Sequence, residues 1–374
     1  METIKGFKDY TGEEAKKRAE IKKILVETFE KYGFEPTETP VIEAEEFVRG
    51  ENTNDEAVSD IYKLEDKGKR KLALRYEFTF QLKRLMQNKK LPYKRYQLGE
   101  VFRDEPVSSN RFRQFVQSDI DTIGSTIKDD AEILALTKEV LEKLGIKFKI
   151  YAGNRALLNE ILEELGIKSN QNQILREIDK LGKLPEAEIK SNLKKYKAEN
   201  FLDILKKPEK YYEKYKSYGD ISELRRLCKY YDVNFIFQPS LVRGLSYYNK
   251  NVFEIKTKEI NETIVGGGSY IFNGIQSTGI SFGLGRLSSL AKLDYEKEKY
   301  LVISLDKDKE AINITNKLRK NNIVNLFYGK PSKALEYANS YKFSKVIFVG
   351  EKEIKNKKFM VKDMKSGKES VLKI

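Results

Sequence analysis

The chain has 374 residues, with no histidine and a single cysteine, Cys228. These counts exclude imidazole acid–base catalysis, zinc sites with histidine ligands and an internal disulfide. The net charge of +14 favours a polyanionic partner such as nucleic acid, although a lysine-rich composition without such a partner also fits.

The N-terminal part of the chain predicts one long helix followed by short elements. Thr11 to Glu14 fits a capping box, and the helical face that begins at Ile21 ends at Gly33. The following elements are an edge-like extended stretch with two prolines at 34–42, strands at 61–66 and 71–79, and a helix at about 79–87.

Residues 94–124 predict two strands joined by a polar loop. Because successive side chains of a strand point to opposite faces, the opposite face of the second strand holds Phe112, Val116 and Ile120 for packing. An unpaired charge is too costly to bury, so the charged face must meet water or a polar ligand. That face carries Arg111, Arg113, Phe115, Gln117, Asp119 and Asp121.

The middle of the chain predicts a helix at about 129–144 that ends at Gly145, followed by a strand at 148–154. A lysine- and glutamate-rich segment at about 155–231 reads as a helical insertion. Strands then follow at 234–238, 249–257 and 261–265, before a glycine triplet (Gly266–Gly268) that we interpret as a loop where backbone can approach a ligand closely. From residue 298 on, strands alternate with helices, which predicts a small α/β unit with a parallel sheet.

Four arginines lie at strand ends or strand–loop junctions: Arg103, Arg111, Arg243 and Arg286. Arginine matches phosphate and carboxylate groups with two parallel hydrogen bonds. Arg286 follows a predicted strand at 280–282 and Gly283, in the first turn of a helix whose dipole would also favour an anion; an ordinary surface arginine is the alternative. The set suits a polyphosphate whose developing charge is stabilised without a general base.

These segments resemble the signature motifs of the class II aminoacyl-tRNA synthetases. Arg75–Thr79 with Phe102–Phe115 is similar to the second motif, Gly283–Leu287 to the third, and Gly33–Phe34 with Pro40 to the first. Arg243–Tyr248 resembles a signature of histidyl-tRNA synthetases. The resemblance covers the whole chain and is weakest in the helical insertion.

The resemblance implies an α+β fold with two domains. Residues 1–298 would form the catalytic domain, an antiparallel sheet flanked by helices with the insertion at about 155–231. Residues 299–374 would form an α/β anticodon-binding domain. The family is dimeric, so we expect a homodimer. No apolar run approaches the roughly 20 residues that span a bilayer, and we expect a cytoplasmic protein without membrane contact.

The resemblance also implies a reaction. Histidine would be activated by ATP to histidyl-adenylate, with ATP as a substrate accompanied by Mg²⁺, and then transferred to tRNA(His). The carboxylate nucleophile is already ionised, so this displacement needs position and positive charge rather than a base. A pocket that hydrogen-bonds L-histidine would reject apolar competitors strongly. No histidine or cysteine of the protein would bind the metal.

The resemblance assigns roles to individual residues. Arg103 would hold the α-phosphate and the amino-acid carboxylate, and Glu105 the adenine amine. Arg111 and Arg286 would hold the β- and γ-phosphates, while Arg243 would stabilise the charge at the α-phosphate. The residues implied to surround histidine are Glu77, Thr79, Gln117, Asp121, Tyr247 and Tyr248.

The chain also departs from the family pattern, and two alternatives stay open. Ser246 stands where aspartate is usual, Gly285 replaces an acidic residue, Ser269 replaces arginine, and Asp104 stands where many relatives have histidine. One alternative is a catalytically inert paralogue, such as the regulatory subunit of ATP phosphoribosyltransferase, which lacks the C-terminal unit. The other is a class II synthetase for a different amino acid.

Overall fold

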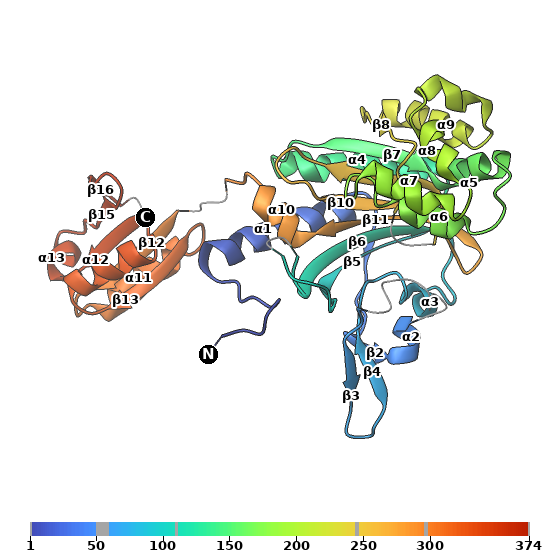
Figure 1. Cartoon of the computed structure of the whole chain (residues 1–374). Coiled ribbons are helices and arrows are strands. Elements are labelled where there is room, and N and C mark those ends of the chain that lie inside the picture. Colours follow the sequence, from blue (N-terminus) through green and yellow to red (C-terminus); the bar gives the residue numbers. More distant parts are fainter. Residues whose placement is uncertain (1, 50–59, 109–110, 244–246, 295–297, 373–374) are drawn as a thin grey trace. The chain divides into compact units, whose positions relative to one another are not determined.

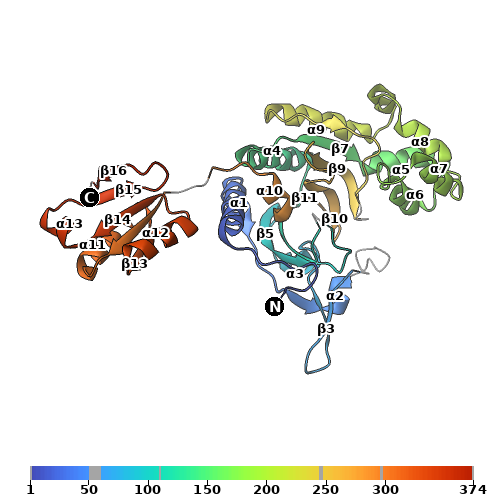
Figure 2. The same cartoon turned by 60° about the vertical axis from the view of Figure 1, so that its left-hand side comes forward.

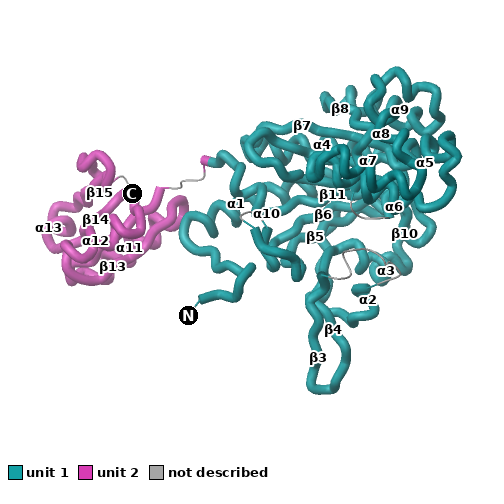
Figure 3. Tube along the Cα trace, in the orientation of Figure 1, with its two compact units in different colours: residues 1–293 teal, residues 294–374 magenta. Residues whose placement is uncertain are grey.

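The computed structural model describes residues 2–49, 60–108, 111–243, 247–294 and 298–372. The chain divides into two compact units, Met1–Leu293 and Asp294–Ile374 (Figure 3). Helices and strands are mixed in both units, which confirms the predicted α+β class. None of the helices within the described ranges is long and apolar enough to cross a bilayer.

The first unit is built on an eight-stranded sheet (Figures 1 and 2). Its inner pairings are all antiparallel, and only the two-residue edge strands pair in parallel. In spatial order the strands are β1 (Glu35–Pro36), β5 (Tyr93–Phe102), β6 (Gln114–Ile123), β11 (Ile275–Gly283), β10 (Val265–Phe272), β9 (Tyr248–Lys256), β7 (Lys149–Asn154) and β8 (Ile236–Phe237).

Helices cover one face of this sheet and form the main hydrophobic core with it. Ile120 of β6 and Phe282 of β11 are buried on the covered face. Because β6 alternates, Gln117, Asp119 and Asp121 face the other way. One strand therefore supplies both the core and a polar surface. The covering helices are α1 (Gly12–Lys31), α4 (Ile127–Lys143), α9 (Tyr218–Tyr230) and α10 (Leu284–Leu290).

The strand predicted from Arg111 begins later, at Gln114, so the prediction that Arg111 and Arg113 belong to its alternating face is wrong. The Arg113 backbone N–H donates to Gly6 O over 2.9 Å, and its Nη2 lies 3.1 Å from Asp104 Oδ1. Arg113 therefore holds the N-terminal segment against the loop that precedes β6.

The predicted helical insertion is helical in the structure and has a hydrophobic cluster of its own. Its last helix, α9, contributes Ile221 to that cluster and Leu224 to the main core. This shared helix attaches the insertion to the sheet. The other elements of the insertion are α5 (Arg155–Glu164), α6 (Gln171–Ile178), α7 (Glu186–Lys194), α8 (Glu199–Leu205) and the 3₁₀ helix η2 (Glu209–Lys214).

A three-stranded sheet projects from the first unit (Figure 1). The predicted helix at 79–87 is the single turn α3 in the structure, and just before it the Phe80 N–H donates to the Glu77 carboxylate over 2.6 Å. Arg75 joins this region to β5 through a 2.6 Å hydrogen bond to Glu100 O. The elements are β2 (Ile42–Ala44), α2 (Glu45–Arg49), β3 (Lys63–Glu65), β4 (Lys71–Leu74) and α3 (Leu82–Leu85).

The glycine triplet does not form a loop, contrary to the prediction, but lies within β10. Strands β10 and β11 form a hairpin whose turn contains Asn273 and Gly274 at φ 48° and 76°. Asn-Gly is the strongest short-range hairpin signal in a sequence, and the prediction did not use it. A Cβ on Gly267 would lie 2.0 Å from Gly279 O of the neighbouring strand, so only glycine fits there.

The second unit is a five-stranded sheet between helices. Alternation along β12 directs Leu301 and Ile303 to the cluster containing α12, and Val302 to the cluster containing α11. The predicted alternation of parallel strands and helices is present, while the antiparallel strands β15 and β16 were not predicted. The elements are β12 (Lys299–Ser304), α11 (Asp308–Leu318), β13 (Ile323–Tyr328), α12 (Pro331–Ser340), β14 (Lys345–Val349), α13 (Glu351–Lys355), β15 (Met360–Asp363) and β16 (Glu369–Val371).

Replacing Thr126 with alanine should lower the free energy of unfolding by about 1 kcal/mol. Thr126 caps α4 because its hydroxyl oxygen accepts from the Lys128 N–H, and the Asp129 carboxylate accepts from the Thr126 N–H. Thr11 is the matched control, because its side chain makes no capping hydrogen bond and the capping box predicted there is wrong. Equal losses for Thr126→Ala and Thr11→Ala in urea unfolding would contradict this account.

Candidate active site

A cavity of about 450 Å³ lies on the polar face of the eight-stranded sheet. The structure places every site residue predicted from the sequence on its wall except Arg286. The predicted residues that line it are Glu77, Thr79, Arg103, Glu105, Arg111, Gln117, Asp121, Arg243, Tyr247 and Tyr248.

Arg103 follows the end of β5 and is held mainly by neutral groups. Its Nε donates to Tyr76 O over 3.3 Å and its Nη2 to Gln117 Oε1 over 3.2 Å. Glu105 Oε1 is 3.8 Å from Nη1, beyond hydrogen-bond range. Glu105 Oε2 is 3.4 Å from Arg111 Nη1, so this carboxylate lies between two guanidinium groups. Two guanidinium groups beside one carboxylate leave a net positive charge for an anion.

Arg243 lies on the other side of the cavity, against β10. A Cβ on Gly266 would come within 2.2 Å of Arg243 Nη1, so the guanidinium occupies the space that this glycine leaves. Its Nη1 also donates to Glu254 Oε1 over 3.2 Å. Burial alone would lower the pKa of Arg243, but the neighbouring Tyr248 and Glu254 outweigh burial and raise it. Arg243 therefore stays charged.

Arg286 lies off the cavity wall, in the first turn of α10. Its Nη1 donates to Thr263 O over 2.7 Å. Burial lowers the pKa of Arg286, Glu262 opposes this, and the positive charges of the other three arginines lower it further. The four arginines are thus close enough to repel one another, although only three of them line the cavity.

The floor of the cavity contains a buried ion pair. Asp121 Oδ2 is 2.7 Å from Nη2 of Arg95, a side chain with no exposed surface. Asp121 Oδ1 accepts the Tyr270 hydroxyl hydrogen over 2.6 Å. A Cβ on Gly279 would lie 2.2 Å from the same oxygen, so this position also requires glycine.

Asp119 lies beside that pair and is 5% exposed. Its Oδ2 accepts a 2.9 Å hydrogen bond from Gln117 Nε2. Burial and then the negative charge of Asp121 raise the pKa of Asp119 to about 7, although Arg95, Ser281 and Gln117 act in the opposite direction. The two carboxylates share one arginine.

Glu77, Thr79 and the tyrosine pair form the remaining walls. Glu77 is buried, and burial raises its pKa even though Thr79 and the Phe80 N–H hydrogen-bond to it. The rings of Tyr247 and Tyr248 have centroids 4.8 Å apart. Burial raises the pKa of both phenols, so they remain neutral donors beside the carboxylates.

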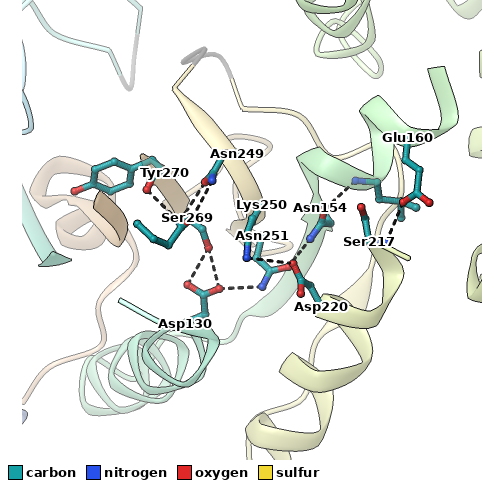
Figure 4. Close-up of polar contacts among 12 residues, drawn as sticks. Asp130, Asn154, Glu160, Ser217, Asp220, Asn249, Lys250, Asn251, Ser269 and Tyr270 are labelled. Carbon is teal, nitrogen blue, oxygen red and sulfur yellow. Dashed lines mark hydrogen bonds and ion pairs between the residues drawn. The ribbon is translucent and has the colours of Figure 1, made fainter. Parts of the chain in front are cut away.

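Behind β10, a buried polar network supports the strand from the opposite face (Figure 4). Ser269 Oγ donates to Asp130 at 3.0 and 2.9 Å from its two oxygens. Asn251 Nδ2 donates to Asp130 Oδ2 over 2.9 Å, and Asn154 Nδ2 donates to Asn251 Oδ1 over 2.9 Å. Burial raises the pKa of Asp130 to about 6. Ser269 therefore contributes a neutral donor to this network.

The other departures from the family pattern lie away from the cavity or outside the described residues. Asp104 pairs with Arg113. Gly285 is exposed, with nothing within 4 Å of the position a Cβ would take. Ser246 lies outside the described residues. The carboxylate that Arg243 needs comes from Glu254, on β9.

Arg95, Tyr270 and Glu254 were not predicted as site residues. Arg95 pairs with Asp121 across β5 and β6, so the register of that hairpin is the signal that would have found it. Tyr270 lines the cavity and Glu254 reaches Arg243 because β9 and β10 pair with each other and β10 pairs with β11. No local pattern in the sequence gives that arrangement.

Solved structures share this antiparallel sheet, which is the catalytic fold of class II aminoacyl-tRNA synthetases. The histidyl-tRNA synthetase structure from Nostoc sp. PCC 7120 has a TM-score of 0.86 at 23% identity and covers 99% of this chain and 96% of that chain. A structure described as an ATP phosphoribosyltransferase regulatory subunit/histidyl-tRNA synthetase from Bacillus halodurans C has a TM-score of 0.77 at 21% identity, covering 93% and 97%.

Sequence comparisons narrow the class to one family. A family model described as Histidyl-tRNA synthetase matches residues 6–287, and one described as Anticodon binding domain matches 299–374. Histidine–tRNA ligase 1 of Bacillus thuringiensis subsp. konkukian is 32% identical over 412 residues, covering 99% of this chain and 97% of the relative. The ligase of Methanocaldococcus jannaschii is 34% identical over 409 residues, covering 99% and 97%. The chain belongs to the histidyl-tRNA synthetase family.

Replacing Gly266 with alanine should lower the kcat of histidine-dependent ATP–pyrophosphate exchange at least ~10-fold, because the new Cβ displaces the Arg243 guanidinium. Gly285→Ala is the matched control, since nothing lies within 4 Å of its Cβ position. Steady-state kinetics with unfolding curves for both variants test this. An unchanged kcat for Gly266→Ala would show that the position of Arg243 does not matter.

Asp119 should make stability depend on pH. Its pKa is raised from 3.8 to about 7 in the folded state. Between these pH values the folded state holds a proton on Asp119 that the unfolded state has lost, and this proton stabilises the fold. The stabilisation disappears as the pH rises through 7. Asp119→Asn is neutral at every pH. The unfolding free energy of Asp119→Asn minus that of wild type should therefore increase by at least ~1 kcal/mol from pH 4 to pH 7.5. Urea unfolding at several pH values measures this, and parallel curves would contradict it.

Proposed function

We propose that this chain is a histidine–tRNA ligase, which activates histidine with ATP and transfers it to tRNA(His). One observation carries the proposal. Arg103 and Arg243 flank the same cavity whose floor holds the Asp119 and Asp121 carboxylates. The arginines can bind an anionic phosphate, and the carboxylates beside them can bind a cationic or N–H-rich amino acid.

The first step is an in-line displacement at phosphorus. A carboxylate oxygen of histidine forms a bond to the α-phosphorus of ATP, the bond from that phosphorus to the bridging oxygen breaks, and pyrophosphate leaves with the electron pair. No proton needs to be removed, which suits a chain without histidine. In the second step a ribose hydroxyl at the 3′ end of the tRNA attacks the carbonyl carbon, the bond from that carbon to the AMP oxygen breaks, and AMP leaves with the electron pair and the hydroxyl proton.

Positive charge around the phosphates is the main catalytic contribution. Arg103 holds the α-phosphate and the histidine carboxylate, and Arg243 stabilises the charge that builds at the α-phosphate. Arg111 and Arg286 hold the β- and γ-phosphates, and Glu105 accepts from the adenine amine. Arg286 lies off the cavity wall, so its role requires ATP to extend beyond the cavity towards α10.

Polar groups and tyrosines hold the amino acid. Gln117, with its amide shared between Arg103 and Asp119, lies where the two substrates meet. Asp121 is fixed by Arg95 and Tyr270. The complete set for histidine is Glu77, Thr79, Gln117, Asp121, Tyr247 and Tyr248. A site built from such groups rejects apolar amino acids, because binding them would leave buried polar groups unpaired.

Magnesium would reach the site with ATP. Across the described ranges there is no group of three or more Cys, Asp or Glu side chains that could hold a metal ion. Mg²⁺ needs no such group, since it keeps several waters and commonly binds through one or two carboxylates plus substrate phosphates.

The same proposal covers domains, assembly and location. Residues 1–298 are the catalytic domain, with the insertion at about 155–231, and residues 299–374 bind the anticodon of the tRNA. The net charge of +14 suits a tRNA backbone, where contacts to phosphates position rather than specify. The enzyme works as a homodimer in the cytoplasm.

Two features disfavour a regulatory paralogue, even though a structure described with that name shares the fold. Residues 299–374 match the anticodon-binding model, and all four arginines are present. A synthetase for another amino acid is disfavoured by the Arg243–Tyr248 segment and by relatives that carry the histidine–tRNA ligase name along the full chain.

Amino-acid-dependent ATP–pyrophosphate exchange with the purified chain tests the proposal. Exchange should require histidine, and Arg243→Ala should reduce kcat by about 10²–10³-fold or more, because a charge-stabilising donor is lost in the transition state. The unfolding free energy should change little by comparison. Absence of histidine-dependent exchange by folded protein would refute the function, while an active Arg243→Ala variant would show that the site is misassigned.

A further inference from the structure

Asp119 lies on the cavity floor but has been assigned no contact with either substrate, and it has fewer protein partners than Asp121. It lines the cavity, and its side chain is 5% exposed. A carboxylate can accept about four hydrogen bonds. Within the described residues, Asp119 takes part in no ion pair closer than 4 Å, and its Oδ1 has no hydrogen-bond partner.

Asp121, on the same face of β6, differs in this respect. Arg95 lies against one of its oxygens and the Tyr270 hydroxyl donates to the other. Asp121 therefore already has a cation and a donor from the protein. A buried carboxylate that has no paired cation and one oxygen without a donor costs free energy unless a ligand supplies the missing contacts. Of the two neighbours, Asp119 is the one that needs a ligand.

The position of Asp119 indicates which group of the ligand meets it. Gln117 Oε1 accepts from Arg103 and its Nε2 donates to Asp119, so one amide joins the two side chains. Arg103 is assigned to the carboxylate of histidine. The α-ammonium group is attached to the carbon next to that carboxylate, so it comes within reach of Asp119. An ammonium supplies three N–H donors and a full positive charge.

We propose that the Asp119 carboxylate binds the α-ammonium group of the amino-acid substrate and selects against ligands that lack it. The inference rests on the proposed function and adds one specificity residue to it. The charge balance of the floor supports the assignment. Asp119 and Asp121 face a single arginine, Arg95, so an ammonium ion neutralises the excess negative charge. Burial and then the negative charge of Asp121 raise the pKa of Asp119, in line with this excess of negative charge.

The test compares two ligands that differ only in the ammonium group. The KM for histidine and the inhibition constant of its deamino analogue, 3-(imidazol-4-yl)propionate, are measured in the same exchange assay. Asp119→Asn should raise the KM for histidine by about 10- to 100-fold, the effect of a lost hydrogen bond to a charged group. It should leave the inhibition constant of the analogue unchanged.

Asp121→Asn is the comparison variant. Its carboxylate contacts Arg95 and Tyr270 rather than the ammonium, so its replacement should weaken both ligands to a similar extent. Equal weakening of both ligands by Asp119→Asn would assign Asp119 a structural role and overturn the proposal, as would an unchanged KM for histidine. Wild-type protein without histidine-dependent exchange would instead refute the proposed function.

A second variant keeps the test decisive if Asp119→Asn is inactive or unstable. Asp119→Ser removes the charge with a smaller polar group, and calorimetric titration measures binding of the two ligands without turnover. Circular dichroism and urea unfolding confirm that the protein titrated is folded. Selective loss of histidine affinity supports the proposal, and parallel loss of both affinities contradicts it.

Discussion

The ion pair between Arg95 and Asp121 is the interaction on which the arrangement of the cavity depends. Arg95 has no exposed surface, and a buried charge is tolerated only with close compensation. Asp121 provides that compensation at 2.7 Å, and this fixes the register of β5 against β6. Tyr270 then reaches Asp121 from β10. The floor of the site is thus one electrostatic unit drawn from three strands.

Room for these charged side chains is created by glycines. Gly266 leaves the space that Arg243 occupies, and Gly279 leaves the space for the Asp121 carboxylate. A methyl group at either position would overlap the charged group. Glycine usually weakens a strand. At these two positions it nevertheless lets a guanidinium or a carboxylate pack directly against the backbone of the neighbouring strand.

Much of this architecture could be predicted from local pattern, and the failures share a physical cause. The alternation from Gln117 to Asp121 and the helix stop at Gly145 follow from periodicity and backbone preference. The glycine triplet was misread because pairing with β11, not propensity, makes it a strand. The Thr11 capping box failed because the spacing of residues does not ensure that the hydrogen bonds form.

The sequence by itself determined which chemistry is available: arginines and carboxylates at strand ends, no imidazole, and motifs that assign the chain to a family. The tertiary structure alone decided which charges meet. It pairs Arg95 with Asp121 and Arg243 with Glu254, and among the described residues it places no cation within ion-pair distance of Asp119. The reason is that these contacts depend on the register between strands far apart in the chain, and a local pattern does not encode that register.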